Sequence, residues 1–403
     1  MSFVLGVVLF ALGIGISIAL HEAGHMYTAK AFGMKVRRYF IGFGPTLFSF
    51  RRGETEYGLK AIPAGGFCDI VGMTAMDELP DPADRKRAFY RFATWKRVVV
   101  LSGGIAVNFV LGTVVLYGAA VSTGLPNIDA GQPVVGEVSA CIGATGSGAC
   151  PPGAPAPARD AGLQPGDRIL AVGGTEVESF AEVSEQTQQL AGPTAFLIER
   201  DGQQRSLVID IARVPVSSLM TDPAAPDELV GAIGVAPPPE PRLLTFGALE
   251  AVPATFDYTG TLFANVWEAL LTLPERIPPL LAAIAGEERS YDTPVSVVGA
   301  SILGGDAAQL DQWSFFIFLL AALNFFLGAF NMLPLLPLDG GHITVNLYER
   351  ARNGVRRLTG RPDGPPVDYT RLLPLTYAVF LVMLAFGALT LTADIVNPLR
   401  LGQ

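Results

Sequence analysis

Four long apolar runs constrain this chain more than any other feature of its sequence. They cover residues 3–29, 98–125, 313–338 and 373–393. Each is long enough to cross the hydrocarbon core of a bilayer, which takes about 20 apolar residues in a helix. The chain is also 50% hydrophobic and only 16% charged, which is unusual for a soluble globular protein. The sequence therefore predicts a mainly α-helical polytopic membrane protein, with transmembrane helices at 1–30, 98–125, 313–338 and 373–395.

The first run contains residues of a metal-binding type. His21 and His25 are four positions apart, so on a helix they project from one face and can hold one Zn²⁺, with Glu22 beside them in reach of a bound water. A match to so short a pattern also occurs by chance. Residues 1–20 carry no charge, however, and ionisable groups in such a segment are costly unless they bind something. We therefore expect a zinc site in the first span, with Glu22 placed to reach a water bound there.

The third ligand is expected at the end of the run 313–338. Catalytic zinc usually takes three protein ligands and leaves one position open. Asp339 follows two prolines, Pro334 and Pro337, which break a helix and open the backbone around a buried site. The alternative is that Asp339 only marks the exit from the membrane. The third histidine of the chain, His342, is expected to support the ligands or to belong to the turn.

The distribution of basic residues predicts the orientation. The segments 31–97 and 339–372 are rich in Lys and Arg, whereas the much longer segment 126–312 has only eight. By the positive-inside rule, both shorter loops are cytoplasmic, and both termini face outside. The first run has no basic residue before it, so it is expected to be a retained helix of the plasma membrane rather than a secretory signal. The net charge of −9 comes largely from the outer part and gives no indication of nucleic-acid binding.

The cytoplasmic segment 31–97 is expected to carry a membrane-associated β-hairpin. Residues 47–63 alternate between apolar and polar around a charged turn at Gly53, a pattern typical of a hairpin. It could be a surface hairpin without a special role. It also follows the metal helix directly and ends near Gly65 and Gly66, so an open strand edge there could pair with an unwound substrate segment.

Small and polar residues recur in the second span. Gly103, Gly104 and Asn108 are of the kind that lets helices pack closely in lipid or lines a polar cavity, and we favour packing for the glycines.

Residues 130–215 have the pattern of an inserted α+β domain outside the membrane. The run Ala161–Gly174 passes from a short helix through a Gly/Pro turn into a strand and resembles the signature of PDZ domains, which bind extended peptides by strand addition. Cys141 and Cys150 are expected to form a disulfide on this outer side, and Cys68 is expected to be a packed thiol.

Residues 237–312 are too polar to span a membrane and too apolar to be free in solution. We expect amphipathic helices on the outer membrane surface; a compact helical linker is the alternative.

Taken together, these motifs resemble the site-2 protease family, and specifically its bacterial branch with a PDZ domain between the second and third spans. The residues in family order are the His-Glu-x-x-His helix, the hairpin, the PDZ signature, and Asn-x-x-Pro-x-x-Pro-Leu-Asp-Gly-Gly at 331–341. Residues 1–72 resemble the mycobacterial and actinobacterial member that acts in envelope stress. The resemblance implies that His21, His25 and Asp339 are metal ligands, that Glu22 is the general base, and that Asn331 positions the substrate or its oxyanion. Asn324 does not match a second family asparagine and is not assigned.

The resemblance also implies a function, namely zinc-dependent cleavage within the transmembrane segments of single-pass proteins. The implied substrates are anti-sigma factors already cut by an upstream site-1 protease, and remnant signal peptides are a second class. The PDZ domain is expected to act as a filter that admits trimmed substrates, and the sequence leaves open whether it does so by blocking or by recruiting. Two other classes of protein are the alternatives. A catalytically inactive PDZ-bearing scaffold or receptor is disfavoured by the intact Glu22 and Asp339. A zinc-binding membrane sensor or carrier would need acidic or His residues along several spans.

Overall fold

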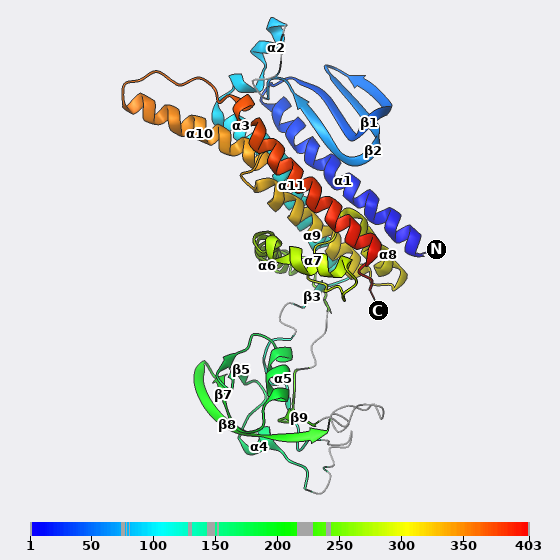
Figure 1. Cartoon of the computed structure of the whole chain (residues 1–403), viewed down its shortest axis with the longest axis vertical. Helices are drawn as coiled ribbons and strands as arrows, with labels where there is room; N and C mark the ends of the chain where they lie inside the picture. The colour runs from blue at the N-terminus through cyan, green and yellow to red at the C-terminus, as the bar shows by residue number, and fades with distance from the viewer. Residues whose placement is uncertain are drawn as a thin grey trace. The chain divides into compact units, whose positions relative to one another are not determined.

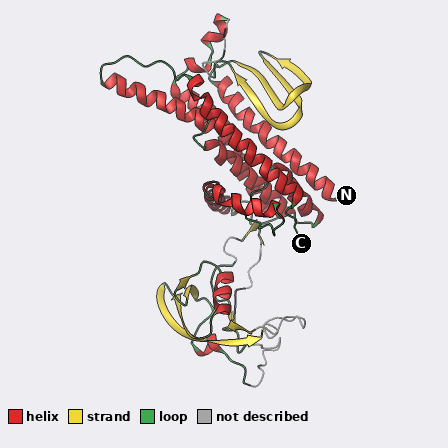
Figure 2. Cartoon of the chain, in the orientation of Figure 1, coloured by secondary structure: helices red, strands yellow, loops and turns green. Residues whose placement is uncertain are grey.

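The computed structural model describes residues 2–73, 77, 79, 81–127, 131–142, 150, 153–215, 229–238 and 243–401, apart from the side chains of residues 63 and 64. The chain divides into two compact units, one made of Met1–Leu125 with Thr245–Gln403 and the other of Pro126–Leu244. Figure 1 follows the chain from end to end, and Figure 2 shows that the first unit is mainly helical, whereas the second contains a sheet. The expected domain at 130–215 lies in the second unit. The two units are described separately.

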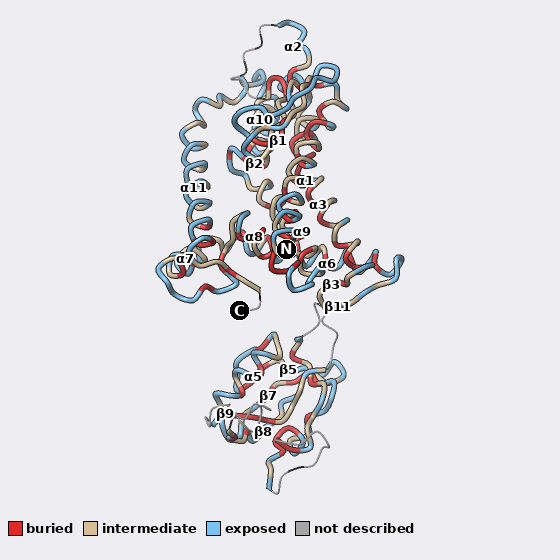
Figure 3. Tube along the Cα trace, turned by 90° about the vertical axis from the view of Figure 1, so that its right-hand side faces the viewer, coloured by how far each residue is buried: buried red, intermediate tan, exposed pale blue. Residues whose placement is uncertain are grey.

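Four helices of the first unit are long and apolar enough to cross a membrane: α1 (Ser2–Ala31), α3 (Thr94–Ser122), α9 (Trp313–Met332) and α11 (Tyr369–Val396). These four candidate spans correspond to the four expected from the sequence. Helix α9 ends six residues before the expected boundary at 338, because Pro334 and Pro337 cannot continue it. Most of α11 is exposed (Figure 3), and its buried residues are confined to Thr390, Ala393 and Asp394 near its C-terminus.

The described residues of this unit form further helices. They are α2 (Pro82–Lys86), η1 (Phe89–Arg91), α6 (Ala251–Leu271), η3 (Leu273–Arg276), α7 (Ile277–Ile284), α8 (Val297–Gln309) and α10 (Asp339–Leu358). Helix α6 shares a hydrophobic core with α3 and α9, and α8 packs along α1. The region 237–312 therefore contains helices, as expected, and their location at the membrane surface remains a prediction.

Helix α10 occupies most of the segment 339–372, which the sequence predicts to be the cytoplasmic connection between the third and fourth spans. Its Glu349 forms an ion pair with Arg97 of α3, with an Nη1–Oε2 distance of 3.3 Å. The polar face of α10 thus packs on the protein, so polarity alone was a poor guide to its structure.

The sheet of the first unit consists of β1 (Val36–Arg52) and β2 (Thr55–Ile70), which are antiparallel. Phe40 of β1 pairs with Phe67 on one side and with Gly58 on the other, and both partners belong to β2. This pairing shows that the strands are bent. Four segments therefore lie side by side in the order 66–69, 38–41, 55–60 and 46–52. The bend in β1 uses Gly42, whose φ of +87° is in the region that favours glycine. The predicted hairpin at 47–63 is confirmed as part of this larger sheet.

The second unit is built on a five-stranded antiparallel sheet in the order β6-β5-β7-β8-β9. Its elements are β4 (Glu137–Val138), α4 (Pro157–Asp160), β5 (Arg168–Val172), β6 (Thr175–Glu176), α5 (Phe180–Gln189), β7 (Gly192–Arg200), β8 (Gln203–Pro215), β9 (Leu229–Ala232) and β10 (Val235–Ala236). The short strands β3 (Leu125–Pro126) and β11 (Leu243–Leu244) lie where the chain passes between the units. The sheet and α5 enclose a core that contains Ile169, Phe196 and Ile198.

Two cysteine predictions are confirmed. Cys141 and Cys150 form a disulfide. Cys68 is a free, partly buried thiol that packs against the hydrophobic core containing Met26 and Val100.

Candidate metal centre

The structure brings His21, His25 and Asp339 together, although more than 300 residues separate the aspartate from the histidines. The Nε2 atoms of the two histidines are 3.2 Å apart, and Asp339 Oδ2 lies 3.3 Å from each of them. Both histidine side chains are almost entirely buried. The three atoms therefore form a nearly equilateral triangle at the junction of α1 and α10.

This triangle has the dimensions of a tetrahedral zinc site. Zn–N and Zn–O bonds of about 2.0–2.1 Å place the ligand atoms of a tetrahedron about 3.3 Å apart, which matches the observed separations. Asp339 Oδ2 is buried and makes no hydrogen bond within the described residues, although two ring nitrogens are close to it. Such an arrangement is expected for atoms whose lone pairs converge on a cation. The donor set therefore fits zinc.

Contacts with α3 orient both imidazole rings. His25 Nδ1 lies 2.8 Å from the carbonyl oxygen of Val100, so Nδ1 carries the proton and donates it, and the Nε2 lone pair remains for a metal. His21 Nδ1 lies 3.1 Å from the side-chain amide of Asn108, whose Oδ1 is buried without a hydrogen-bond partner among the described residues. If the amide is oriented so that Oδ1 accepts from His21 Nδ1–H, both groups are satisfied and His21 Nε2 is also left free.

A glycine in α3 creates the space for the two rings. A Cβ atom at Gly104 would lie 2.4 Å from His25 Nε2 and 2.7 Å from His21 Nε2, so no larger residue fits while the rings stay in place. One residue earlier, Gly103 allows close contact with Gly24 of α1, since a Cβ on Gly24 would lie 2.4 Å from the Gly103 carbonyl oxygen. The predicted packing role of these glycines is confirmed, and Gly104 also shapes the metal centre.

Glu22 lies between the metal ligands and the sheet. Its carboxylate is close enough to His21, His25 and Asp339 for electrostatic interaction, and it also interacts with the backbone of Cys68 in β2. A Cβ on Gly66 would lie 3.1 Å from Glu22 Cγ, so the strand segment 66–69 passes directly beside this side chain. A carboxylate in this position can accept a proton from a water held at the centre.

Asp339 reaches the histidines because the chain breaks between α9 and α10. The break contains a cis peptide bond between Leu336 and Pro337, and Asp339 is the first residue of α10. The next residue must be small, since a Cβ on Gly340 would lie 2.3 Å from the carbonyl oxygen of Met332. The Pro- and Gly-containing sequence thus folds the backbone tightly enough to place the carboxylate in the membrane unit's interior.

Two other predicted residues lie outside this triangle. Asn331 Nδ2 donates to the Leu327 carbonyl oxygen of its own helix, at 3.0 Å. The His342 ring stacks on Tyr369, with ring centroids 5.7 Å apart, rather than contacting a ligand. Burial lowers the pKa of His342 below its usual 6.5, which disfavours a further positive charge near the centre.

Sequence reasoning missed the direct contacts of Val100, Gly104 and Asn108 with the histidines. The signal was the presence of a polar residue and paired glycines in an apolar span, but composition could not show which face of α3 they occupy. Asn324, the other buried asparagine considered from the sequence, donates to the Leu320 carbonyl oxygen of its own helix.

Comparison with known proteins agrees with this geometry. A family model described as Peptidase family M50 matches residues 9–360. The zinc metalloprotease Rip1 of Mycolicibacterium smegmatis is 48% identical over 413 residues, covering 100% of this chain and 100% of that protein. Rip1 of Mycobacterium tuberculosis is 47% identical over 411 residues, again with 100% of each chain covered.

Proposed function

The chain belongs to peptidase family M50, the site-2 protease family, and from this membership we propose that it is an intramembrane zinc endopeptidase that cleaves the transmembrane segments of single-pass membrane proteins. The observation that carries the proposal is the triangle of His21, His25 and Asp339, whose ligand atoms are 3.2–3.3 Å apart with Glu22 beside them. In this proposal the three residues hold zinc. When bound, zinc supplies Lewis-acid activation of water and of the scissile carbonyl.

Glu22 is assigned as the general base and acid. It takes the proton of the attacking water and returns it to the leaving amine. Val100 and Asn108 hold the imidazoles in one orientation throughout, which keeps the ligand positions fixed. Asn331 is assigned to substrate or oxyanion positioning on the strength of the family motif.

The sheet supplies a surface for an extended substrate. A transmembrane helix uses its own amides in hydrogen bonds, so a peptidase needs the segment to unwind, and a strand edge offers replacement partners for the freed backbone groups. Among the residues that the structure describes, segment 66–69 pairs with 38–41 on one side only, and it passes beside Glu22. The exposed apolar residues Leu47 and Phe48 at the opposite edge of the sheet support its association with the membrane.

The second unit is proposed to be an extracytoplasmic PDZ domain. Its five-stranded sheet with α5 and the signature at Ala161–Gly174 support this assignment, and the excess of Lys and Arg in the segments 31–97 and 339–372 supports an orientation with both termini outside. The proposed substrates are anti-sigma factors that a site-1 protease has already shortened, and the domain acts as the filter for that first cut.

The proposal is tested with the full-length protein purified in detergent, a tagged single-pass anti-sigma segment, and quantified zinc. The variants are Glu22→Gln and, as a matched control, Glu268→Gln at an exposed position of α6. We expect cleavage by the wild type and by Glu268→Gln, no cleavage by Glu22→Gln, and one zinc per chain in all three. Zinc binding without cleavage of shortened segments would favour a sensor or scaffold. Cleavage by zinc-free protein would refute the mechanism.

A further inference from the structure

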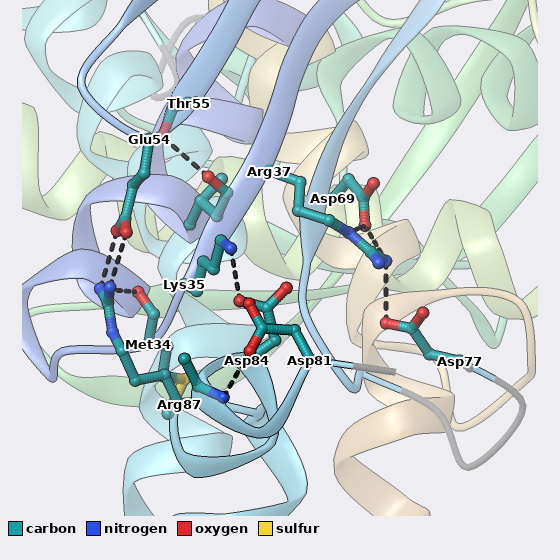
Figure 4. A network of polar contacts seen from close by, with 12 residues as sticks. Met34, Lys35, Arg37, Glu54, Thr55, Asp69, Asp77, Asp81, Asp84 and Arg87 are labelled. Carbon is teal, nitrogen blue, oxygen red and sulfur yellow. Dashed lines mark hydrogen bonds and ion pairs between the residues drawn. The ribbon is translucent and has the colours of Figure 1, made fainter. Parts of the chain in front are cut away.

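The strand segment beside Glu22 is held at one end by a carboxylate that two arginines share. Asp69 directly follows Cys68 in β2. Its Oδ1 accepts a hydrogen bond from Arg37 Nη2 at 3.0 Å, and its Oδ2 accepts one from Arg38 Nε at 2.9 Å. Both arginines come from β1, and Figure 4 shows the Arg37 contact. The Asp69 side chain is only 14% exposed, so its part-buried contact with Arg37 is shielded from water more than an ordinary surface pair, whereas the Arg38 side chain is 54% exposed.

The same arginine also binds the segment that follows the sheet. Arg37 Nη2 lies 2.8 Å from Asp77 Oδ2 (Figure 4). The same oxygen accepts a further hydrogen bond from the Gly72 amide at 2.7 Å. Arg37 therefore joins the carboxylate at the end of the edge strand to the chain beyond it. Together, Arg37, Arg38, Asp69 and Asp77 form a group that we call the strand clamp.

The register of the edge strand is what the strand clamp can control. Asp69 is paired with Arg38, and Gly66 is paired with Ile41 in the same ladder. A slip by one residue would replace Gly66 by Gly65 or Phe67 next to Glu22 and would reverse the face of every side chain. Because a Cβ at position 66 would already lie 3.1 Å from Glu22 Cγ, a phenylalanine there would displace the carboxylate. An edge strand with a single neighbour depends on such contacts for its register.

We propose that Asp69 is a positioning residue of the peptidase, which fixes the register of segment 66–69 and thereby the distance between Glu22 and the strand edge that binds an extended substrate. The effect of Asp69 on cleavage rests on the proposed function, whereas its effect on the register of the strand does not. Its consequence is a role in substrate binding rather than in zinc binding, because Asp69 contacts none of the three ligands.

A matched pair of variants separates this role from a general loss of charge. Asp69→Asn keeps the shape of the side chain but removes its charge, and Asp69→Glu keeps the charge. The control is Asp84→Asn, which breaks the neighbouring ion pair with Lys35 but lies in α2 rather than in the edge strand (Figure 4). KM, kcat and zinc content are measured with the tagged single-pass segment.

For Asp69→Asn we expect KM to rise about tenfold, the size of effect typical of losing charge-assisted hydrogen bonds, with kcat and zinc content near the wild-type values. Asp69→Glu should recover part of the affinity, and Asp84→Asn should behave like the wild type. Equal effects of Asp69→Asn and Asp84→Asn on KM would overturn the inference, as would a loss of kcat with KM unchanged.

A second measurement reports on register without cleavage. Cys68 is the free cysteine of the chain and is adjacent to Asp69, so its rate of alkylation by an uncharged maleimide follows the position of the strand. We expect faster alkylation in Asp69→Asn and an unchanged rate in Asp84→Asn. If the wild type fails to cleave while this difference is observed, the proposed function fails and the positioning role stands. Identical alkylation rates in all variants would refute the positioning role.

Discussion

Replacing Gly104 by alanine is the sharpest single test of the metal centre. The new methyl carbon would lie 2.4 Å from His25 Nε2 and 2.7 Å from His21 Nε2, whereas ordinary contact distances begin at 3.4 Å. The difference is 1.0 Å at His25, so a ring must move by about that amount. Metal sites tolerate displacements of about 0.2 Å, and a misplacement of about 1 Å costs roughly 100-fold in rate. We therefore expect at least a 100-fold loss of cleavage, or about 2.7 kcal/mol, together with weaker zinc binding.

The control for this experiment is Gly118→Ala in the same helix. No atom lies within 4 Å of a Cβ at Gly118, and alanine is the better helix former, so this variant should retain zinc and activity. Zinc is quantified after purification, and cleavage is measured under single-turnover conditions. If Gly104→Ala unfolds instead, the added substitutions His21→Ala and His25→Ala should restore thermal stability, because they remove both rings that the methyl group meets. Full zinc content and activity in Gly104→Ala, or no recovery in the triple variant, would refute the packing argument.

Three further outcomes follow from the structure. Asn108→Ala should weaken zinc affinity by about 10–100-fold, the usual effect of losing a group that orients a ligand. Asn324→Ala removes a buried amide that donates to its own helix and should leave zinc affinity unchanged. Competition with a chromophoric chelator measures both affinities, and equal values in the two variants would contradict the role of Asn108 in orienting His21. Burial raises the pKa of the Asp167 carboxyl, but the hydrogen bonds from Arg200 more than offset this and leave the pKa below its usual 3.8. The pair therefore stabilises the second unit above pH 3.8, and this stability is lost as the pH falls through the lowered pKa. Limited proteolysis of the second unit as a function of pH should show the loss in the wild type, and a similar acid transition in Asp167→Asn would contradict the role of the pair. Removal of zinc with a strong chelator should abolish cleavage and zinc addition should restore it, while activity that survives complete metal removal would exclude the proposed chemistry.

Sequence periodicity predicted local structure best where a single physical requirement dominates. The four spans follow from apolar length alone, because a helix must satisfy its backbone hydrogen bonds internally in lipid. Sequence periodicity gave less information about the segment 339–372, where α10 forms although the segment is polar. There the ion pair between Glu349 and Arg97 stabilises a polar face against α3, and such a contact has no signature in the segment itself.

The sheet shows the same limit. Alternation at residues 47–63 predicted a hairpin, but the pairing of Phe40 with both Phe67 and Gly58 arises only when the strands bend. Residue types give no direct measure of where a long strand folds back on itself, since the outcome depends on contacts formed with α1 and with the segment after the sheet.

The sequence by itself determined the chemistry of this protein. The spacing of His21, Glu22 and His25 in an uncharged run, with Asp339 after two prolines, specified a metal-binding set because few other arrangements justify ionisable groups in lipid. Only the tertiary structure decided that these atoms meet at 3.2–3.3 Å, that Gly104 and Asn108 of α3 surround them, and that segment 66–69 lies beside Glu22. These facts depend on how separate helices and strands pack, and packing is fixed by contacts between residues that are distant in the sequence.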